Sequence, residues 1–266
     1  MKTVLHTESS PGLGGQEIRT LHEAQWTAER GWRAIVACQP DRPLYSRARE
    51  AGVETVPIRM RSPWDVRALG RLVRVLSREQ VSIVHTHSSV DAWVGGAAAR
   101  IARVPVVRTR HVSIPIRAGW NPVYTRLADR VITSGHAIRQ MVVTAGVAPH
   151  RVVAIPAGVN LERFAFRPSS ARRGAASAVV GSVAMFRGSK GHDHLIEAFR
   201  HVRTACPRAT LLLVGDGLRR QWVERLARDA GLEHAVVFTG FRHDVAALLA
   251  SMDCFVLAST RTEGVP

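Results

Sequence analysis

Cysteine is scarce in this 266-residue sequence, which contains only three. Cys38, Cys206 and Cys254 are scattered along the chain and lack the short spacings of metal ligands. The sequence therefore argues against a disulfide framework and against a cysteine-based zinc module. We expect the protein to work in a reducing compartment, the cytoplasm.

Long apolar runs are also missing. No stretch approaches the ~18 unbroken apolar residues that a membrane-spanning helix needs. The first thirty residues lack the charged start and apolar core of a secretory signal. With 46% apolar and 22% charged residues, the composition is that of a globular protein and argues against wholesale disorder.

Acidic residues are few beside basic ones. The chain has 37 Lys and Arg against 21 Asp and Glu, a formal net charge of +16. Such a surplus points to an anionic partner: a nucleic acid, an acidic membrane or a phosphorylated small molecule. The surplus is spread along the chain without a block of like charge, so a basic solvated surface explains it equally well.

Short apolar runs alternate with amphipathic stretches through most of the chain. Alternation of this kind builds parallel sheets covered by helices on both faces. Right-handed crossovers then favour doubly wound topology, so we predict an α/β protein of Rossmann-like domains. The expected strands are 2–7, 33–38, 53–58, 81–86, 104–109, 130–133, 179–184, 209–214, 235–239 and 253–258, and the expected helices are 16–30, 65–78, 91–102, 190–203 and 218–230.

The alternation breaks after Ile155. Residues 156–178 contain prolines, glycines and serines without a sustained period, which is typical of a linker. We expect a first domain over residues 1–160, a linker over 161–177 and a second domain over 178–266. A four-stranded α/β domain has an exposed edge and an uncovered face, so we expect the second domain to be incomplete.

The residues that follow each strand are candidates for a site, because open parallel sheets bind ligands at the carboxyl ends of their strands. Gly12 and Gly14 follow the first strand, but Glu17 stands where a dinucleotide fingerprint needs its third glycine. A tight turn and an anion site remain equal alternatives there. His85 and His87 have a spacing that suits metal ligation, but no third ligand is evident, so we predict no metal site. Hydrogen bonding to a sugar and a structural role remain equal alternatives for these two histidines.

Cations follow two further strands. In the segment RTRH over 108–111, guanidinium groups suit phosphate or carboxylate, and His111 suits a polar or proton-handling role. The segment RGSKG over 187–191 is more suggestive, because two cations meet the start of a helix there, as a diphosphate requires. Its spacing is not that of a P-loop, and a basic surface turn is the alternative.

Glycine-rich turns follow the remaining strands of the second half. Gly215-Asp216-Gly217 forms a tight turn, and Gly240-Phe241-Arg242 places an aromatic ring where a nucleotide base can lie. In the last segment, 259–266, Glu263 offers a carboxylate to sugar hydroxyls. The backbone N–H groups of Gly264 and Val265 suit a phosphate, and an ordinary turn, which also uses residues such as Gly264 and Pro266, is the alternative.

In their order and spacing, these segments resemble the retaining glycosyltransferase family 4, whose members have the two-domain GT-B fold. The resemblance runs through the whole chain. The segments that carry it are Gly14-Gly15-Gln16-Glu17, Val84-His85-Thr86-His87-Ser88, Arg110-His111, Ile132-Thr133-Ser134, Ile155-Pro156-Ala157-Gly158-Val159-Asn160, Lys190-Gly191-His192, Val214-Gly215-Asp216-Gly217, Phe238-Thr239-Gly240 and Ser259 through Pro266.

The resemblance implies a nucleotide-diphospho-sugar donor held mainly by the second domain and an acceptor held mainly by the first. It implies transfer in the cleft between the domains, with retention of configuration and without a bound metal or other cofactor. Arg187 and Lys190 would hold the diphosphate and offset the charge of the leaving group, and His111 would lie near the transferred sugar. The predicted catalytic residues are His111, Arg187, Lys190 and Glu263, and the predicted donor-binding residues are Gly14, Gly15, Arg187, Lys190, Gly215, Phe241, Arg242, Glu263, Gly264 and Val265.

The chain departs from the family pattern in three places. Glu263 matches the first glutamate of the E-x7-E motif, but the second glutamate is absent, so we expect little or no activity from this chain as given. Ala157-Gly158 stands where many members have Asn-Gly. Met185 stands where members usually have an arginine, and the diphosphate role is therefore assigned to Arg187.

We therefore predict a hexosyltransferase or related enzyme that acts on a lipid-linked or polysaccharide acceptor, such as lipopolysaccharide or another cell-envelope glycan. We expect it in the cytoplasm, with its basic surface against the inner face of an anionic membrane. A nucleotide-sugar epimerase or hydrolase of the same fold is an alternative, but it needs paired carboxylates that the sequence does not place. A basic nucleic-acid-binding protein is a second alternative; no nucleic-acid motif is recognisable, so no nucleic-acid partner is expected.

Overall fold

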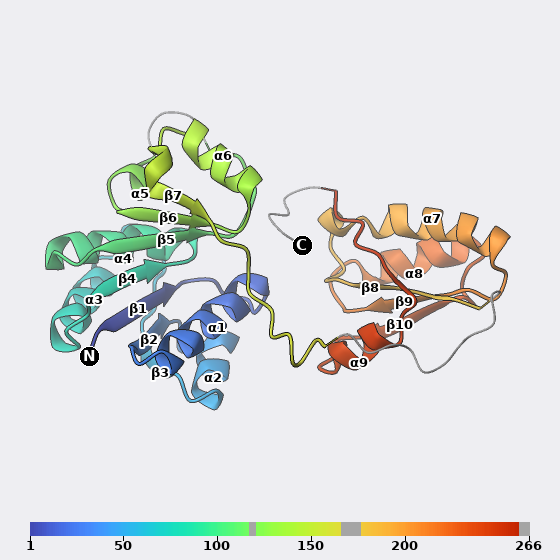
Figure 1. Ribbon diagram of the computed structural model, residues 1–266, viewed down its shortest axis with the longest axis horizontal. Helices are drawn as coiled ribbons and strands as arrows, with labels where there is room; N and C mark the ends of the chain where they lie inside the picture. Colours follow the sequence, from blue (N-terminus) through green and yellow to red (C-terminus); the bar gives the residue numbers. More distant parts are fainter. Residues whose placement is uncertain (117–120, 166–176, 261–266) are drawn as a thin grey trace. The chain divides into compact units, whose positions relative to one another are not determined.

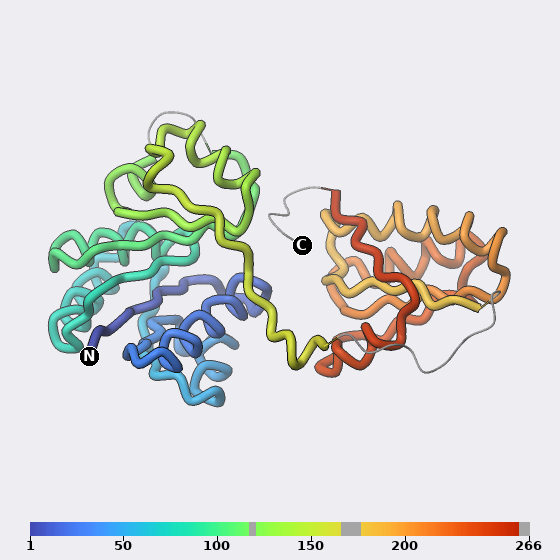
Figure 2. The backbone as a smooth tube through the Cα atoms, viewed as in Figure 1, coloured from blue at the N-terminus to red at the C-terminus, as the bar shows by residue number. Residues whose placement is uncertain are grey.

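The computed structural model describes residues 1–116, 121–165 and 177–260, and within them two compact units. The first unit runs from Met1 to Gly158, and the second begins at Val159. After the last strand of the first unit the chain takes an irregular course over residues 155–160 (Figure 2).

The first unit is built on a seven-stranded parallel sheet with the order β3-β2-β1-β4-β5-β6-β7 (Figure 1). The direction of the strand order reverses between β1 and β4, which is where doubly wound sheets bind ligands. The strands are β1 (Thr3–Glu8), β2 (Arg33–Cys38), β3 (Glu54–Pro57), β4 (Ile83–Thr86), β5 (Val106–Arg110), β6 (Arg130–Thr133) and β7 (Val152–Ala154).

Helices cover both faces of this sheet. The side chains of β2 point alternately to the two faces, and each face carries an apolar core. Ile35 and Ala37 belong to the larger core, whereas Val36 and Cys38 belong to a smaller core on the opposite face. The helices are α1 (Gly15–Glu29), α2 (Pro43–Glu50), α3 (Val66–Arg78), α4 (Ser89–Ala102), α5 (Pro122–Thr125) and α6 (His136–Thr144), with a 3₁₀ turn at Pro149–Arg151. Both faces of the strands are therefore buried, as parallel sheets require.

The second unit has a four-stranded parallel sheet with the order β10-β9-β8-β11. Its core gathers Phe186, Phe199, Leu211 and Val223, all fully buried. The strands are β8 (Val179–Val183), β9 (Thr210–Val214), β10 (Val236–Gly240) and β11 (Cys254–Phe255). The helices are α7 (His192–Ala205), α8 (Arg220–Asp229) and α9 (Val245–Ala250), with a 3₁₀ turn, η2, at Gly188–Lys190.

The structure confirms the predicted fold class, with two parallel α/β units. The sequence analysis missed four helices, α2, α5, α6 and α9, and the strand β7. The helices have eight, four, nine and six residues. Hydrophobic periodicity is measured over windows of about 11 residues or more, so elements this short leave no clear period.

One helix begins later than predicted. The helix expected over 218–230, with Leu218 on its apolar face, starts at Arg220, and Leu218 is fully exposed. The residues of α8 that are buried are Val223 and Ala227. The difference arises around Gly217, which has a φ of +156°, outside the helical region. The N–H of Arg219 donates to the carbonyl of Phe186 at 3.1 Å, outside the helix.

No helix in the described ranges combines the length and the apolar character that crossing a membrane requires.

Candidate functional site

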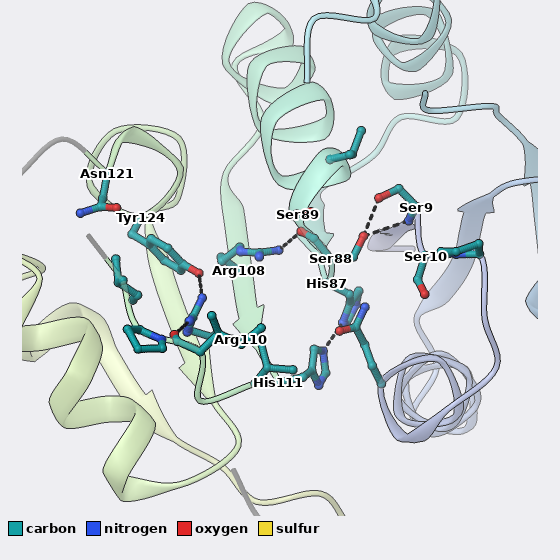
Figure 3. A pocket seen from close by; sticks show the side chains of 17 residues that line it. Ser9, Ser10, His87, Ser88, Ser89, Arg108, Arg110, His111, Asn121 and Tyr124 are labelled. Atoms are coloured by element: carbon teal, nitrogen blue, oxygen red, sulfur yellow. Dashed lines mark hydrogen bonds between the residues drawn. The ribbon is translucent and has the colours of Figure 1, made fainter. Parts of the chain in front are cut away.

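The first unit has a cavity of about 660 Å³ at the carboxyl ends of β1, β4 and β5 (Figure 3). This edge adjoins the point where the strand order reverses. The cavity is lined by Ser9, Ser10, Pro11, Gln16, His87, Ser88, Ser89, Val90, Arg108, Arg110, His111, Val112, Ile114, Pro115, Ile116, Asn121 and Tyr124. The described part of the lining contains hydroxyl, amide, imidazole and guanidinium groups, which suit a polar ligand, and no Asp or Glu.

Asp91, a fully buried residue of α4, connects the loops that lie beneath this cavity. Its carboxylate accepts the backbone N–H of His87 at 2.8 Å and that of Ser88 at 2.9 Å. It also accepts the hydroxyls of Thr7 and Ser9, at 3.1 and 3.2 Å, from the end of β1. The loops after β1 and β4 are thus held by one side chain.

Histidines form a hydrogen-bonded chain that runs from the interior to the cavity. The Nδ1 of His6 lies 3.0 Å from the Nε2 of His87, and the Nδ1 of His87 lies 3.3 Å from the Nε2 of His111. His85 lies beside them, with its Nε2 2.7 Å from the Thr109 hydroxyl. The His111 ring, at the end of the chain, lines the cavity (Figure 3).

Burial keeps these imidazoles neutral. It lowers the pKa of His6 to about 4. For His111, burial and then the positive charges of Arg19 and Arg108 lower the pKa to about 3. The other two histidines have pKa values well below the usual range, again mainly because of burial. At neutral pH these histidines therefore offer hydrogen bonds and lone pairs rather than positive charge.

Glu8, the last residue of β1, is a titratable group that the sequence analysis missed. Burial and the nearby Asp91 carboxylate raise the pKa of Glu8 to about 8, although hydrogen bonds from Ser10 and Gln16 oppose the shift. Ser10 donates its backbone N–H at 2.9 Å and Gln16 its side-chain amide at 2.8 Å. The signal in the sequence was the position of Glu8 directly after the strand predicted over residues 2–7. A carboxyl with this pKa can hold a proton at neutral pH beside two residues of the cavity wall.

The arginines of β5 are held by one tyrosine. Arg110 donates to the Tyr124 hydroxyl at 2.6 Å and to the carbonyl of Ile114. The guanidinium of Arg108 lies 5.6 Å from the centre of the Tyr124 ring and donates to the carbonyl of Ser88. Both groups line the cavity, but part of their donor capacity is used within the protein.

Gly14 and Gly15 lie at the start of α1. The N–H of Gly14 donates to the Glu17 carboxylate at 2.6 Å, which caps the helix from within. A Cβ placed on Gly15 would meet no atom within 4 Å, so the space beside it is open. Neither glycine is among the residues that line the cavity.

In the second unit, the loops after β8, β9 and β10 meet at one edge of the sheet. The N–H of Phe186 donates to the carbonyl of Asp216 at 2.9 Å, and the backbone of Gly215 pairs with that of Gly240. This edge therefore brings together the segments around Arg187, Lys190, Gly215 and Phe241 that the sequence analysis singled out. Arg187 is exposed and precedes η2, and Lys190 is half-buried at its end.

Close backbone contacts explain two glycines of this edge. A Cβ on Gly191, where φ is +62°, would lie 2.0 Å from the carbonyl oxygen of Ala258. A Cβ on Gly215, where φ is +135°, would lie 2.1 Å from that of Ala184. Only glycine tolerates such approaches, so the loops pack tightly for structural reasons that hold independently of any ligand.

Arg219 is a further cation at this edge that the sequence analysis missed. Its guanidinium lies 3.4 Å from the Cβ position of Gly188, inside the 187–191 segment. It also lies 5.0 Å from the centre of the Trp222 ring. Its signal in the sequence was its place at the start of the next helix along the sheet edge.

The structure describes two of the remaining predicted donor-binding residues, Phe241 and Arg242. Phe241 is 72% exposed, with His243 edge-on at 5.0 Å. Arg242 forms a two-point ion pair with Asp244 at 2.6 and 2.8 Å, so its charge is already matched. Glu263, Gly264 and Val265 lie outside the described residues.

His85 and His87 belong to a cluster of four residues that could hold a metal ion, which their spacing in the sequence did not reveal. His6 and Glu23 are its other members, and each of the four residues can offer one ligand atom, with all four atoms within 4.8 Å of one another. No metal site was predicted from the sequence, because no third ligand was evident there. His6 and Glu23 lie about 60 to 80 positions away in the chain, so their approach depends on the fold.

Comparison with known proteins gives consistent matches along the chain. Residues 13–163 match the family model for Glycosyltransferase Family 4, and residues 177–266 match that for Glycosyl transferases group 1. The chain is similar to the Escherichia coli UDP-Gal:alpha-D-GlcNAc-diphosphoundecaprenol alpha-1,3-galactosyltransferase, with 25% identity over 99% of this chain and 74% of that protein. It is similar to the 2-deoxystreptamine glucosyltransferase of Streptomyces kanamyceticus, with 25% identity over 75% of this chain and 59% of that protein.

A solved structure has the same fold. Anabaena HepE, crystallised in complex with UDP and glucose, superposes with a TM-score of 0.82 at 22% identity. The alignment covers 99% of this chain and 76% of that one.

Proposed function

Because this chain belongs to glycosyltransferase family 4, we propose that it moves a sugar from a nucleotide-diphospho-sugar donor to a lipid-linked or polysaccharide acceptor of the cell envelope, with retention of anomeric configuration. It is an enzyme of the glycosyltransferase class and has the GT-B fold, with two Rossmann-like units. The proposal assigns the donor mainly to the second unit and the acceptor mainly to the first.

The observation that carries the donor assignment is the meeting of cations at the edge of the second sheet. Arg187, Lys190 and Arg219 lie in or beside the loop that leads into α7. Guanidinium and ammonium groups beside a helix start favour a diphosphate. Two comparisons support a uridine nucleotide: the E. coli relative is named for UDP-Gal, and HepE was solved with UDP.

The cavity of the first unit supports a sugar-containing acceptor. Its hydroxyl, amide and imidazole groups can form the hydrogen bonds that a glycan needs. The E. coli relative, which aligns with 99% of this chain, is named for a diphosphoundecaprenol-linked acceptor. The net charge of +16 supports work at the inner face of an anionic membrane, where each basic residue near the surface contributes about 1 kcal/mol.

In the proposed reaction, the bond between the anomeric carbon and the phosphate oxygen breaks, and its electron pair stays on the nucleoside diphosphate. An acceptor hydroxyl oxygen forms the new bond to that carbon on the same face and gives its proton to the leaving phosphate. Arg187 and Lys190 offset the growing negative charge, so the diphosphate needs no metal ion. Neutral His111 is the proposed hydrogen-bond partner of the transferred sugar.

An epimerase or hydrolase would need paired carboxylates in the reacting site. Among the described residues, no Asp or Glu lines the cavity of the first unit; Glu8 and Asp91 lie behind its wall, where Ser10, Gln16, His87 and Ser88 donate hydrogen bonds to them. This lining favours transfer to an acceptor.

Calorimetric titration with nucleoside diphosphates tests the donor site without requiring turnover. We expect binding of at least one of UDP, GDP and ADP, weakened about 10- to 100-fold by Arg187→Ala or Lys190→Ala, because each removes a charge-assisted hydrogen bond. Arg200→Ala is the matched control, since Arg200 is an exposed cation on α7 paired with Glu197. Absence of binding, or variants that equal the wild type, would overturn the donor assignment.

The acceptor class needs a separate measurement. Because little or no activity is expected from the chain as given, this measurement uses a form of the protein that carries the second glutamate of the E-x7-E motif. Product analysis by mass spectrometry, with polyprenyl-diphosphate glycolipids and free oligosaccharides as acceptors, should then show a hexose added only when an acceptor is present. Donor breakdown that is independent of any acceptor would favour a hydrolase. Sedimentation with anionic and neutral vesicles tests the membrane assignment, and equal binding to both would count against it.

A further inference from the structure

We propose that the first unit contains a buried site for a divalent transition metal ion, of the zinc class, formed by His6, Glu23, His85 and His87. The site does not rest on the proposed transfer reaction and takes no part in its bond-breaking steps. It would join strands β1 and β4 to helix α1.

The backbone brings three of these residues together. His6 of β1 lies directly opposite His85 of β4 in the parallel register. His87 follows two positions later, and since strand side chains alternate between faces, it lies on the same face as His85. The ring centres of His6 and His87 lie 5.3 Å apart, and those of His85 and His87 lie 4.1 Å apart.

Helix α1 supplies the fourth residue. The Glu23 carboxylate Oε2 lies 3.8 Å from the Nδ1 of His85. The three histidines are buried and Glu23 is half-buried, with its Oε2 atom itself buried. Three imidazoles and one carboxylate form a donor set typical of zinc.

The distances suit a small ion. Two ligand atoms at about 2.1 Å from a tetrahedral zinc ion lie about 3.4 Å from each other. The 3.0 Å between His6 and His87 nitrogens and the 3.8 Å between His85 and Glu23 lie on either side of that value. All four ligand atoms lie within 4.8 Å of one another, so inward shifts of about 1 Å or less would complete the shell.

The far atoms of three prospective ligands are held from outside. The Nε2 of His85 is 2.7 Å from the Thr109 hydroxyl, and the Glu23 Oε1 accepts the Nε–H of Arg19 at 2.6 Å. The Nδ1 of His87 faces His111 at 3.3 Å. Metal ligands in proteins are commonly oriented in this way, by a hydrogen bond on the atom that does not touch the ion.

Among the described residues, the Oε2 of Glu23 is a buried atom of the cluster that has no hydrogen-bond partner. Buried polar atoms without a partner are rare in folded proteins, and each one calls for an explanation such as an ion. An ion accounts for this oxygen, which is the one turned toward His85. The Nε2 of His6 also has no partner there, but an ion does not explain it, because the Nδ1 of that ring faces His87.

The competing explanation is a structural cluster of histidines that binds no ion. Arg19 favours it, because its positive charge lies beside Glu23 and opposes a nearby cation. The ion pair uses only one carboxylate oxygen, however, and leaves the other for the cluster. The two explanations differ in one measurable quantity, the metal content of the folded protein.

The test uses the full chain without a histidine tag, freed of metal by dialysis against a chelator and then titrated with Zn²⁺ and with Co²⁺. We expect one ion per chain and, for Co²⁺, the intense visible absorption of a four-coordinate site. His85→Gln and Glu23→Gln should each weaken binding about 10-fold or more. His150→Gln, which changes an exposed histidine outside the cluster, should bind as the wild type does.

Circular dichroism and nucleotide binding by the second unit check that each variant is folded. If His85→Gln does not fold, Glu23→Gln and the Zn²⁺-dependent rise in the melting temperature of the wild type carry the test. The proposal is overturned if the folded wild-type chain takes up no stoichiometric Zn²⁺ or Co²⁺. It is equally overturned if the cluster variants bind as tightly as His150→Gln. Either result leaves the donor-binding experiment unaffected, because Arg187 and Lys190 lie in the other unit.

Discussion

The carboxylate of Asp91 accepts the backbone N–H of His87 from a distance of 2.8 Å. The same carboxylate reaches the Thr7 hydroxyl at 3.1 Å, so it connects α4 with the ends of two neighbouring strands. His87 in turn touches His111, which lines the cavity. The geometry of the proposed acceptor site thus depends on a residue that is fully buried beneath it.

Replacing Asp91 by Ala should destabilise the first unit strongly. Five buried or half-buried donors, on Thr7, Ser9, His87 and Ser88, would lose their acceptor. Unsatisfied buried donors cost about 1–3 kcal/mol each without being additive, so we expect a loss of about 3–5 kcal/mol. Asp65→Ala is the control, since Asp65 caps α3 by accepting the N–H of Ala68 at 3.0 Å, and loss of such a cap costs about 1 kcal/mol. Urea unfolding followed by hydrogen exchange in the first unit measures both. Equal losses in the two variants would contradict the role given to Asp91.

Gly191→Ala should destabilise the loop over residues 187–191, which leads into α7, by more than the strain of its positive φ alone. Gly191 has φ of +62°, and its Cβ would collide with the carbonyl of Ala258. Gly231 has a similar φ of +69°, but a Cβ there meets no atom within 4 Å. We expect Gly231→Ala to cost about 1–2 kcal/mol and Gly191→Ala clearly more, with weaker nucleotide binding as well. Matching melting curves for the two variants would show that the loop yields without strain.

His192 should make the second unit less stable in mild acid. It is buried, with the Phe186 ring edge-on at 4.7 Å. Burial and the nearby charge of Lys190 lower its pKa, although Asp193 opposes the shift. The unfolded chain therefore takes up a proton first as the pH falls, so stability is full above the ordinary value of 6.5 and is lost below it.

The measurement compares the wild type with His192→Gln. Hydrogen exchange in the second unit, from pH 7.5 to pH 5, should show that the stability advantage of the wild type shrinks as the pH falls. An advantage that stays constant over this range would mean that His192 keeps its ordinary pKa.

Cys38 should be inert in the folded protein. It is 2% exposed, and burial together with the Glu8 carboxylate raises the pKa of its thiol to about 12. Thiolate is the reactive form, so a thiol reagent such as Ellman's reagent should modify exposed Cys254 first and Cys206 more slowly. Cys38 should react only after unfolding in denaturant. Mass spectrometry of labelled peptides identifies each site, and early labelling of Cys38 would show that the interior of the first unit opens readily.

Several features of the fold could be read from local sequence. Strand β1, with the sequence TVLHTE, could be predicted from its place before the glycine turn and helix α1. The 15-residue helix α1 could be predicted because a long amphipathic stretch displays the helical period clearly. Short elements such as α9 and β7 were missed for the same reason. The loops after the strands could be singled out as well, because all parallel strands end at one edge.

The identity of the cavity wall depended on contacts that the sequence does not display. Arg110 looked like a free anion ligand, yet Tyr124 holds it at 2.6 Å. Arg242 likewise donates to Asp244. Such pairings depend on side-chain directions, and these are decided only when the segments pack.

The sequence by itself determined the class of fold, because alternating strand and helix periods are a local property of the chain. It also determined that cations and glycines follow the strands of the second half. Only the tertiary structure decided that His6 meets His85 and His87, and that Asp91 holds Thr7. These partners lie about 80 positions apart, and their meeting depends on strand order and register, since a shift of one residue would turn His6 to the opposite face of the sheet.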